Sequence, residues 1–198
     1  GETYCLTEPS GSGKTTLLCI LAGLIRPDAG EVAAPPSCSM VFQEDRLCED
    51  YSAVKNVELV TGNREKAREA LEKLLEKEAL DRPCRQLSGG MRRRVALVRA
   101  MEAQSAYVLL DEPFAAIDAK VRRELRTWLK EMIRGVGITS IFVTHDQEEA
   151  MEVADQIIIT NHGRIEQIGS PEEICTEPQT EFVKEFIDVE RVRKNAAV

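Results

Sequence analysis

A glycine-rich turn near the start of the chain constrains the fold most. The segment Glu8 to Thr16 (Glu8-Pro9-Ser10-Gly11-Ser12-Gly13-Lys14-Thr15-Thr16) follows a short apolar strand expected at Tyr4 to Thr7. It leads into an apolar helix that ends near Gly23. Small residues in such a turn let successive backbone N–H groups point at phosphate oxygens, and the following helix adds the positive end of its dipole. The sequence therefore predicts a phosphate-binding loop.

The side chains of this loop have distinct expected roles. Lys14 would reach the β- and γ-phosphates of a nucleotide, and the Thr15 hydroxyl would bind Mg²⁺. The other expected nucleotide-binding residues are Ser10, Gly11, Ser12, Gly13 and Thr16. The first position of the pattern G-x-x-x-x-G-K-[ST] is Glu8 instead of glycine. A carboxylate there adds negative charge beside a triphosphate, so we expect Glu8→Gly to tighten Mg-ATP binding unless the side chain points outward.

The second half of the chain alternates apolar strands with helices. Strands are expected at Tyr107 to Leu110, Ser140 to Thr144 and Gln156 to Thr160, and helices at Lys120 to Arg134 and Gln147 to Ala154. This alternation predicts an α/β fold with a mainly parallel sheet that is flanked by helices.

Two other segments have recognisable local patterns. Asn161-His162-Gly163 predicts a hairpin turn into a last strand at Arg164 to Ile168. Residues Arg64 to Leu80 have helical periodicity, with Asn63 as the expected cap, and are the best candidate for part of a separate helical subdomain.

Composition and charge exclude several classes of function. The net charge of the 198 residues is -8. Nucleic-acid binders obtain most of their affinity from contacts between basic side chains and phosphates, and therefore usually carry a positive charge. No nucleic acid is therefore expected as a partner of this acidic chain. No apolar run approaches the roughly 18 residues of a membrane span, and no secretory signal opens the chain. The six cysteines show no paired spacing, so we interpret them as reduced thiols.

A second motif specifies the family. Leu87-Ser88-Gly89-Gly90-Met91 precedes a basic helix and then the strand that ends in Asp111-Glu112-Pro113. Together with the phosphate-binding loop, this order resembles the ABC ATPase family, whose signature L-S-G-G-Q differs here at Met91. The resemblance covers essentially the whole chain and implies one ABC ATPase domain over residues 1–198, with the P-loop NTPase fold. Its RecA-like core would span about 1–43 and 102–198, and its helical signature subdomain about 44–101. Family members begin with further strands, which we expect to be missing because Gly1 follows them.

The resemblance also implies roles for single residues. Asp111 would hold Mg²⁺, and Glu112 would be the general base that polarises the attacking water. Gln43 matches the Q-loop glutamine, which senses Mg²⁺ and that water and faces the membrane partner. His145 matches the switch histidine that contacts the γ-phosphate, and Asp118 matches the aspartate of the D-loop.

The signature segment implies a shared active site. In the family, Ser88 and its neighbours Gly89 and Gly90 contact the γ-phosphate that the other subunit binds. The resemblance therefore implies a head-to-tail homo- or heterodimer that closes around two ATP molecules. We interpret the adjacent residues Arg92, Arg93 and Arg94 as a solvent-exposed face of the signature helix.

The kind of ABC protein is indicated by two sets of segments. Thr144 to Met151 and Gly163 to Pro171 resemble import ATPases of the sulfate, polyamine and sugar group, whereas Val41 to Leu47 and Leu87 to Val98 resemble the nitrate, sulfonate and taurine group. The resemblance implies ATP hydrolysis that drives solute import through a separate integral membrane permease, at the cytoplasmic face of the cell membrane. Two alternatives stay open: a soluble ABC ATPase without transport, and a degenerate cassette with weak turnover that acts as a structural partner.

Overall fold

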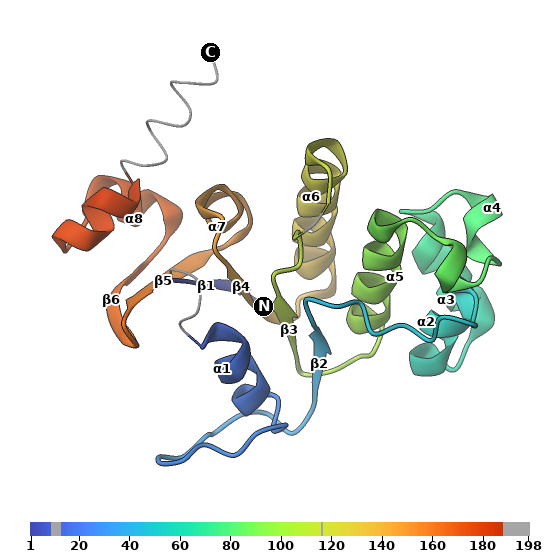
Figure 1. The fold of residues 1–198 in the computed structure, drawn as a ribbon, viewed down its shortest axis with the longest axis horizontal. Coiled ribbons are helices and arrows are strands. Elements are labelled where there is room, and N and C mark those ends of the chain that lie inside the picture. The colour runs from blue at the N-terminus through green and yellow to red at the C-terminus, as the bar shows by residue number, and fades with distance from the viewer. Residues whose placement is uncertain (9–12, 116, 188–198) are drawn as a thin grey trace.

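The computed structural model describes residues 1–8, 13–115 and 117–187, so the predicted roles of Ser10, Gly11 and Ser12 lie outside the described residues. Its centre is a six-stranded sheet with the order β2-β3-β4-β1-β5-β6 (Figure 1). The strands are β1 (Thr3–Thr7), β2 (Cys38–Val41), β3 (Tyr107–Asp111), β4 (Thr139–Thr144), β5 (Gln156–Asn161) and β6 (Arg164–Gly169). All neighbouring pairs are parallel except β5 and β6. The predicted α/β fold with a mainly parallel sheet is confirmed.

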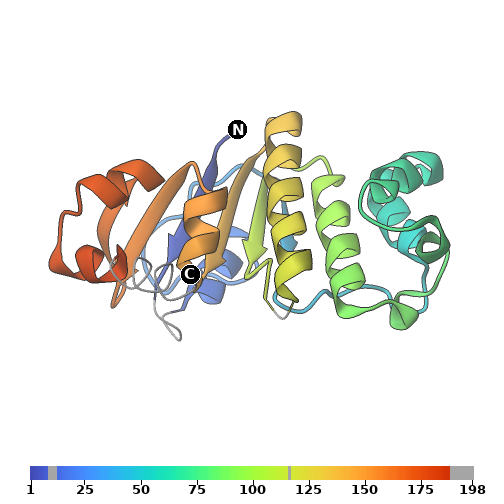
Figure 2. The same cartoon turned by 90° about the horizontal axis from the view of Figure 1, so that it is seen from above.

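Helices cover both faces of this sheet. Helix α1 (Lys14–Leu21) lies on one face, and α5 (Gly89–Met101), α6 (Ala119–Val136) and α7 (Gln147–Val153) lie on the other (Figure 2). The buried side chains on the α1 side are Leu6, Leu18, Tyr107, Leu109 and Val143. The larger cluster on the other side includes Val108, Leu110, Leu125, Leu129, Phe142 and Ile157. Apolar residues on both sides of each central strand explain why those strands have continuous apolar sequences.

The segment between β2 and α5 forms a helical group at one end of the molecule. It contains α2 (Ala53–Thr61), α3 (Arg64–Glu72), α4 (Lys77–Leu80) and the short 3-10 turn η1 (Cys84–Gln86) (Figures 1 and 2). Its own buried cluster is made of Ala53, Val54, Val57, Ala67, Ala70, Leu71, Leu75, Ala79, Leu80, Cys84, Leu87, Val95 and Val98. Val95 and Val98 lie on α5, so that helix joins the group to the sheet.

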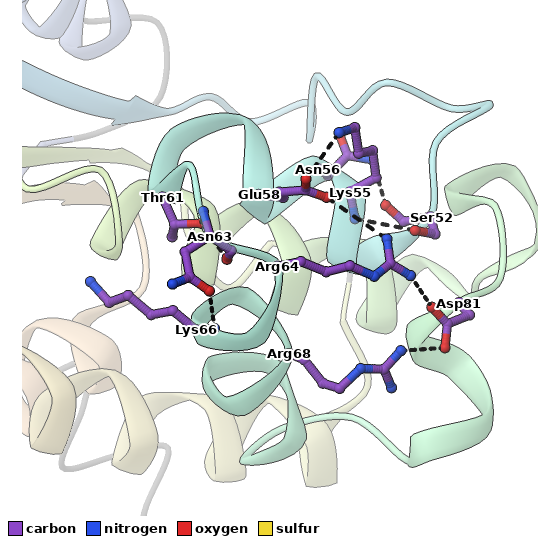
Figure 3. A network of polar contacts seen from close by, with 10 residues as sticks. All are labelled: Ser52, Lys55, Asn56, Glu58, Thr61, Asn63, Arg64, Lys66, Arg68 and Asp81. Carbon is purple, nitrogen blue, oxygen red and sulfur yellow. Dashed lines mark hydrogen bonds and ion pairs between the residues drawn. The ribbon is translucent and has the colours of Figure 1, made fainter.

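Polar contacts at the surface connect the ends of these short helices. The guanidinium groups of Arg64 and Arg68 both bind the carboxylate of Asp81, which follows α4 (Figure 3). The Asn63 side chain accepts a hydrogen bond from the Lys66 backbone, as predicted for the cap of α3. Exposed ion pairs of this kind contribute about 0–1 kcal/mol each, so the buried cluster holds the helices together.

The helical group differs from the sequence expectation in two ways. The single helix predicted for Arg64 to Leu80 is wrong, because the chain turns between α3 and α4. A straight helix of that length would extend about 25 Å and carry Leu80 away from the cluster in which it is fully buried. Helix α2 was not predicted, although its Ser52 cap and the left-handed Gly62 that ends it are recognisable signals.

The last two strands form the predicted hairpin. His162 and Gly163 have φ values of 47° and 74°, the left-handed conformation that two-residue hairpin turns require at both positions. None of the helices in the described ranges is long and apolar enough to cross a membrane.

Candidate functional site

The carboxyl ends of β1, β3 and β4 meet at one edge of the sheet, where α/β folds place their ligands. Gly13, at the start of α1, has φ 90° and ψ 15°, a conformation that glycine adopts without strain. The Lys14 side chain is buried, and its Nζ donates a hydrogen bond to the Glu8 backbone carbonyl at 2.9 Å. The ammonium group is therefore held at the end of β1.

Asp111 ends β3 and is 3% exposed. Burial raises the pKa of its carboxyl group, whereas a hydrogen bond with the Thr15 side chain and the charge of Lys14 oppose that rise. Thr15 and Lys14, at the start of α1, thus both act on the Asp111 carboxyl group. The Thr15 hydroxyl and the Asp111 carboxylate are suitable ligands for Mg²⁺. In nucleotide sites this ion binds only one or two protein groups, and phosphates and water supply its other ligands. Among the described residues no cluster of three acidic, histidine or cysteine side chains could hold a metal by itself.

Glu112 directly follows Asp111 and contacts His145. Its Oε1 lies 3.0 Å from His145 Nδ1. Glu112 has φ 45°, a left-handed conformation that is uncommon for residues other than glycine and that clusters at functional sites. The pair lines a cavity of about 110 Å³ at the ends of β3 and β4. The His145 side chain is 57% exposed, so a ligand could reach the pair from the side of the imidazole ring.

The turn that carries His145 is fixed by hydrogen bonds. Thr144 Oγ1 donates to the buried carboxylate of Glu149 at 2.5 Å and accepts from the Asp146 backbone at 3.0 Å. The Asp146 side chain caps α7 by accepting from the amides of Glu148 and Glu149. Burial raises the pKa of the Glu149 carboxyl group. These contacts hold His145 at the end of β4, where it reaches Glu112.

Gln43 follows β2 and has an exposed side chain. Its backbone carbonyl accepts a hydrogen bond from Arg93 Nη1 at 3.4 Å, while Arg93 Nη2 donates to the Glu112 carbonyl at 2.7 Å. The main chain at Gln43 is therefore separated from that at Glu112 by one guanidinium group.

The interpretation of the three arginines as a solvated face is wrong for Arg94, whose side chain is 17% exposed and donates to the Leu74 carbonyl at 2.9 Å, and is most clearly wrong for Arg93. Its side chain is 4% exposed and donates to backbone carbonyls of two loops, whereas the side chain of Arg92 is 39% exposed. Successive residues of a helix point about 100° apart, so adjacent arginines face different surroundings. Sequence reasoning missed Arg93 because the three side chains are identical and only their direction distinguishes them.

The signature segment lies away from Lys14 of the same chain. Ser88 caps α5 by accepting from the Met91 amide at 3.2 Å, and Ser88 and Gly89 are exposed. In both views, β3 and α6 lie between α1 and α5 (Figures 1 and 2). Asp118 caps α6 in the same manner and is exposed. The structure thus brings Lys14, Thr15, Asp111, Glu112 and His145 to one edge and leaves Ser88 to Gly90 on a separate surface.

Glu8 does not point outward, and that alternative is wrong. The residue is 8% exposed. Its Oε2 accepts from Thr160 Oγ1 at 2.6 Å, and its Oε1 accepts from the Gly163 amide at 3.3 Å. The carboxylate thus joins the start of the phosphate-binding loop to the β5–β6 hairpin. Glu8→Gly would remove this connection together with the negative charge, so tighter Mg-ATP binding no longer follows from charge alone.

We predict that Thr160→Val lowers the free energy of unfolding by about 1–3 kcal/mol, because the buried Glu8 carboxylate loses a donor. Urea denaturation measures the change. Thr127→Val is the matched control, since the Thr127 hydroxyl donates to the Arg123 carbonyl on an exposed helix face and its loss should matter by less than about 0.5 kcal/mol. Equal stabilities of the two variants would show that the Glu8–Thr160 bond contributes nothing.

A family model described as ABC transporter matches residues 1–115, and the chain belongs to that family. It is 47% identical, over its whole length, to the sulfate/thiosulfate import ATP-binding protein CysA of Synechococcus elongatus, of which it covers 63%. The CysA protein of Vibrio vulnificus is 45% identical over 94% of this chain, which covers 61% of that protein. The chain thus spans about three fifths of the length of these relatives.

Solved structures agree with this assignment. The ATP-binding cassette MJ0796, solved as a dimer in a post-hydrolysis state with ADP and Pi, is 30% identical with a TM-score of 0.76, and the match covers 86% of this chain and 85% of that one. An inward-facing ABC transporter described as of metal-chelate type is 25% identical with a TM-score of 0.77. The match covers 88% of this chain and 75% of that one.

Proposed function

We propose that the chain binds Mg-ATP and hydrolyses it to drive solute import through a separate integral membrane permease. The convergence of Lys14, Thr15 and Asp111 with the Glu112–His145 pair at one sheet edge carries this proposal. Each group suits one task in phosphoryl transfer, in which catalysis consists mainly of positioning and charge stabilisation.

Each of these residues would have a separate role in binding Mg-ATP. Lys14 would neutralise the β- and γ-phosphates, and the backbone amides of Ser10, Gly11, Ser12 and Gly13 would bind the phosphate oxygens. Thr15, Asp111 and Gln43 would hold Mg²⁺, which supplies positive charge at the phosphates when bound. Thr16 completes the nucleotide contacts at the start of α1.

Glu112 would accept the proton of the attacking water, and His145 would orient the Glu112 carboxylate. An ionised carboxylate only accepts hydrogen bonds, so the 3.0 Å contact requires a hydrogen on His145 Nδ1. A simultaneous contact from Nε2 to a phosphate oxygen requires a second hydrogen on the ring.

We further propose that two ATPase subunits, identical or different, share each site. The separation of Ser88 to Gly90 from Lys14 within one chain supports this, because the signature segment is then free to complete the site of a partner subunit. Asp118 would lie at the same subunit boundary. The domain would consist of a core over about 1–43 and 102–198 and a helical subdomain over about 44–101.

The relatives support a proposal for the cargo and the location. Because the matching proteins are named for sulfate and thiosulfate import, we propose a small oxyanion of that class as the transported solute. The subunit would then act at the cytoplasmic face of the membrane, bound to its permease.

Phosphate release from Mg-ATP, with and without a co-expressed permease, tests this proposal. Lys14→Ala should weaken ATP binding by about 10- to 100-fold, since hydrogen bonds to charged groups contribute about 1.5–3 kcal/mol. Lys184→Ala, which removes the same charge from an exposed pair with Glu181, should leave binding unchanged. Calorimetry with equal affinities for both variants would refute the assigned site. Turnover that no permease stimulates would favour a non-transport ABC ATPase.

A further inference from the structure

Arg93 is a buried arginine whose guanidinium group is saturated with hydrogen bonds. Its Nε donates to the Pro113 carbonyl at 2.8 Å. Nη1 donates to the Phe42 carbonyl at 2.6 Å and contacts the Gln43 carbonyl at 3.4 Å. Nη2 donates to the carbonyls of Asp111 at 3.1 Å and Glu112 at 2.7 Å. One side chain of α5 therefore holds the main chain of two separate segments.

These two segments follow neighbouring strands. The register of β2 and β3 pairs Val41 with Leu110 and ends there. Arg93 joins the two backbones directly beyond that point, where the sheet no longer does. The planar guanidinium has five N–H donors in a fixed fork, which a lysine ammonium cannot reproduce. The residue is thus suited to fix two loops relative to each other.

The contacts on the β3 side coincide with the unusual backbone at Glu112. The consecutive carbonyls of residues 111, 112 and 113 all bind this one guanidinium. Glu112 has φ 45°, and such conformations persist where the surroundings over-determine them. The same turn directs the Glu112 carboxylate to His145.

The charge of Arg93 is compensated locally. Asp45 Oδ1 lies 3.4 Å from Nη1 and its Oδ2 lies 3.9 Å from Nε of Arg92. Burial lowers the pKa of the Arg93 guanidinium, and the charge of Asp45 opposes that shift. Asp45 belongs to the segment after β2, so the ion pair adds to the connection between α5 and the Gln43 segment.

We propose that Arg93 is a positioning residue that fixes the Gln43 segment and the Glu112 turn relative to each other, so that the groups acting on the attacking water are held in register. This inference rests on the function proposed for Glu112 and Gln43. Arg93 acts through the main chain of these residues and does not bind nucleotide.

The kinetic test compares Arg93→Gln with Arg92→Gln, which removes the same charge from the same helix beside the same Asp45. Arg93→Gln should lower kcat by about tenfold or more and leave the Kd for Mg-ATP within about twofold, because Lys14 is untouched. Arg92→Gln should change neither quantity by more than about twofold. Arg93→Lys keeps the charge but not the fork, and its kcat should stay at least about fivefold low. It also carries the test if Arg93→Gln does not fold.

Amide hydrogen exchange supplies a readout that does not depend on ATP hydrolysis. The Ala115 amide donates to the Glu112 carbonyl, and the Leu75 amide donates to the Leu71 carbonyl inside the helical group. In Arg93→Gln, exchange at Ala115 should become faster while exchange at Leu75 is unchanged.

The outcomes separate the two proposals. In a parent chain that hydrolyses ATP, equal kcat values for Arg93→Gln and Arg92→Gln would overturn the positioning role. Unchanged exchange at Ala115, or an equal increase at Leu75, would overturn it in any parent chain. Faster exchange at Ala115 alone, in a parent chain that does not hydrolyse ATP, would uphold the structural connection and refute the proposed ATPase instead.

Discussion

Glu112→Gln is expected to lower kcat for ATP hydrolysis by about 10²-fold or more, the usual scale of general-base catalysis. The carboxamide has nearly the same shape as the carboxylate, and its oxygen can still accept the hydrogen bond from His145 Nδ1. It cannot take a proton from water. The backbone turn held by Arg93 is unaffected, so Mg-ATP binding should persist and an ATP-bound dimer should accumulate. Phosphate release measures the rate, calorimetry the affinity, and size-exclusion chromatography the dimer.

Glu148→Gln is the matched control for this substitution. Glu148 is an exposed carboxylate in the first turn of α7, near Arg126. Its replacement removes the same charge close to His145 without touching the cavity edge, and kcat should stay within about twofold of the parent. A Glu112→Gln protein that turns over like Glu148→Gln would rule out Glu112 as the base.

Ser88→Arg should reduce hydrolysis to background while the ATP affinity of the monomer changes little. A long cation at the exposed start of α5 would prevent a second subunit from closing over the site. The substitution also removes the helix cap, which contributes about 1 kcal/mol. Ser88→Thr retains the cap and separates the two effects. We expect Ser88→Thr to keep most of the activity, measured by phosphate release.

A mixture of Ser88→Arg and Lys14→Ala proteins tests the shared site directly. In a mixed dimer, one site combines the intact Lys14 of the first variant with the intact Ser88 of the second. Activity should therefore return on mixing, although each variant alone is inactive. If the site lay within one chain, no mixture of the two proteins could restore turnover.

Local sequence predicted the parts of the fold that depend on short-range patterns. Strands β1, β3 and β4 are apolar runs that end at polar residues, and they were placed to within a residue or two. The break between α3 and α4 was missed because residues 73–76 favour a helix, and only the burial of Leu75 and Leu80 in the shared cluster requires the turn.

The candidate site shows the same limit. Lys14, Asp111 and His145 follow recognisable strands, so their meeting at one edge could be expected. The partners of Glu8 could not, because Thr160 and Gly163 lie 152 and 155 residues away along the chain. The exposure of each of the three adjacent arginines likewise depends on how α5 packs against its neighbours, and sequence periodicity does not specify that rotation.

The position of β1 in the sheet has a consequence for biosynthesis. Both strands that pair with β1 come from the second half of the chain, β4 at Thr139–Thr144 and β5 at Gln156–Asn161. A nascent chain therefore exposes an unpaired apolar strand and its phosphate-binding loop until about 150 further residues have been synthesised, or about 8–30 s at typical elongation rates. The helical group, whose contacts are local, can fold during that interval. Newly made protein would thus acquire a compact helical end well before β1 could pair and the phosphate-binding site could form.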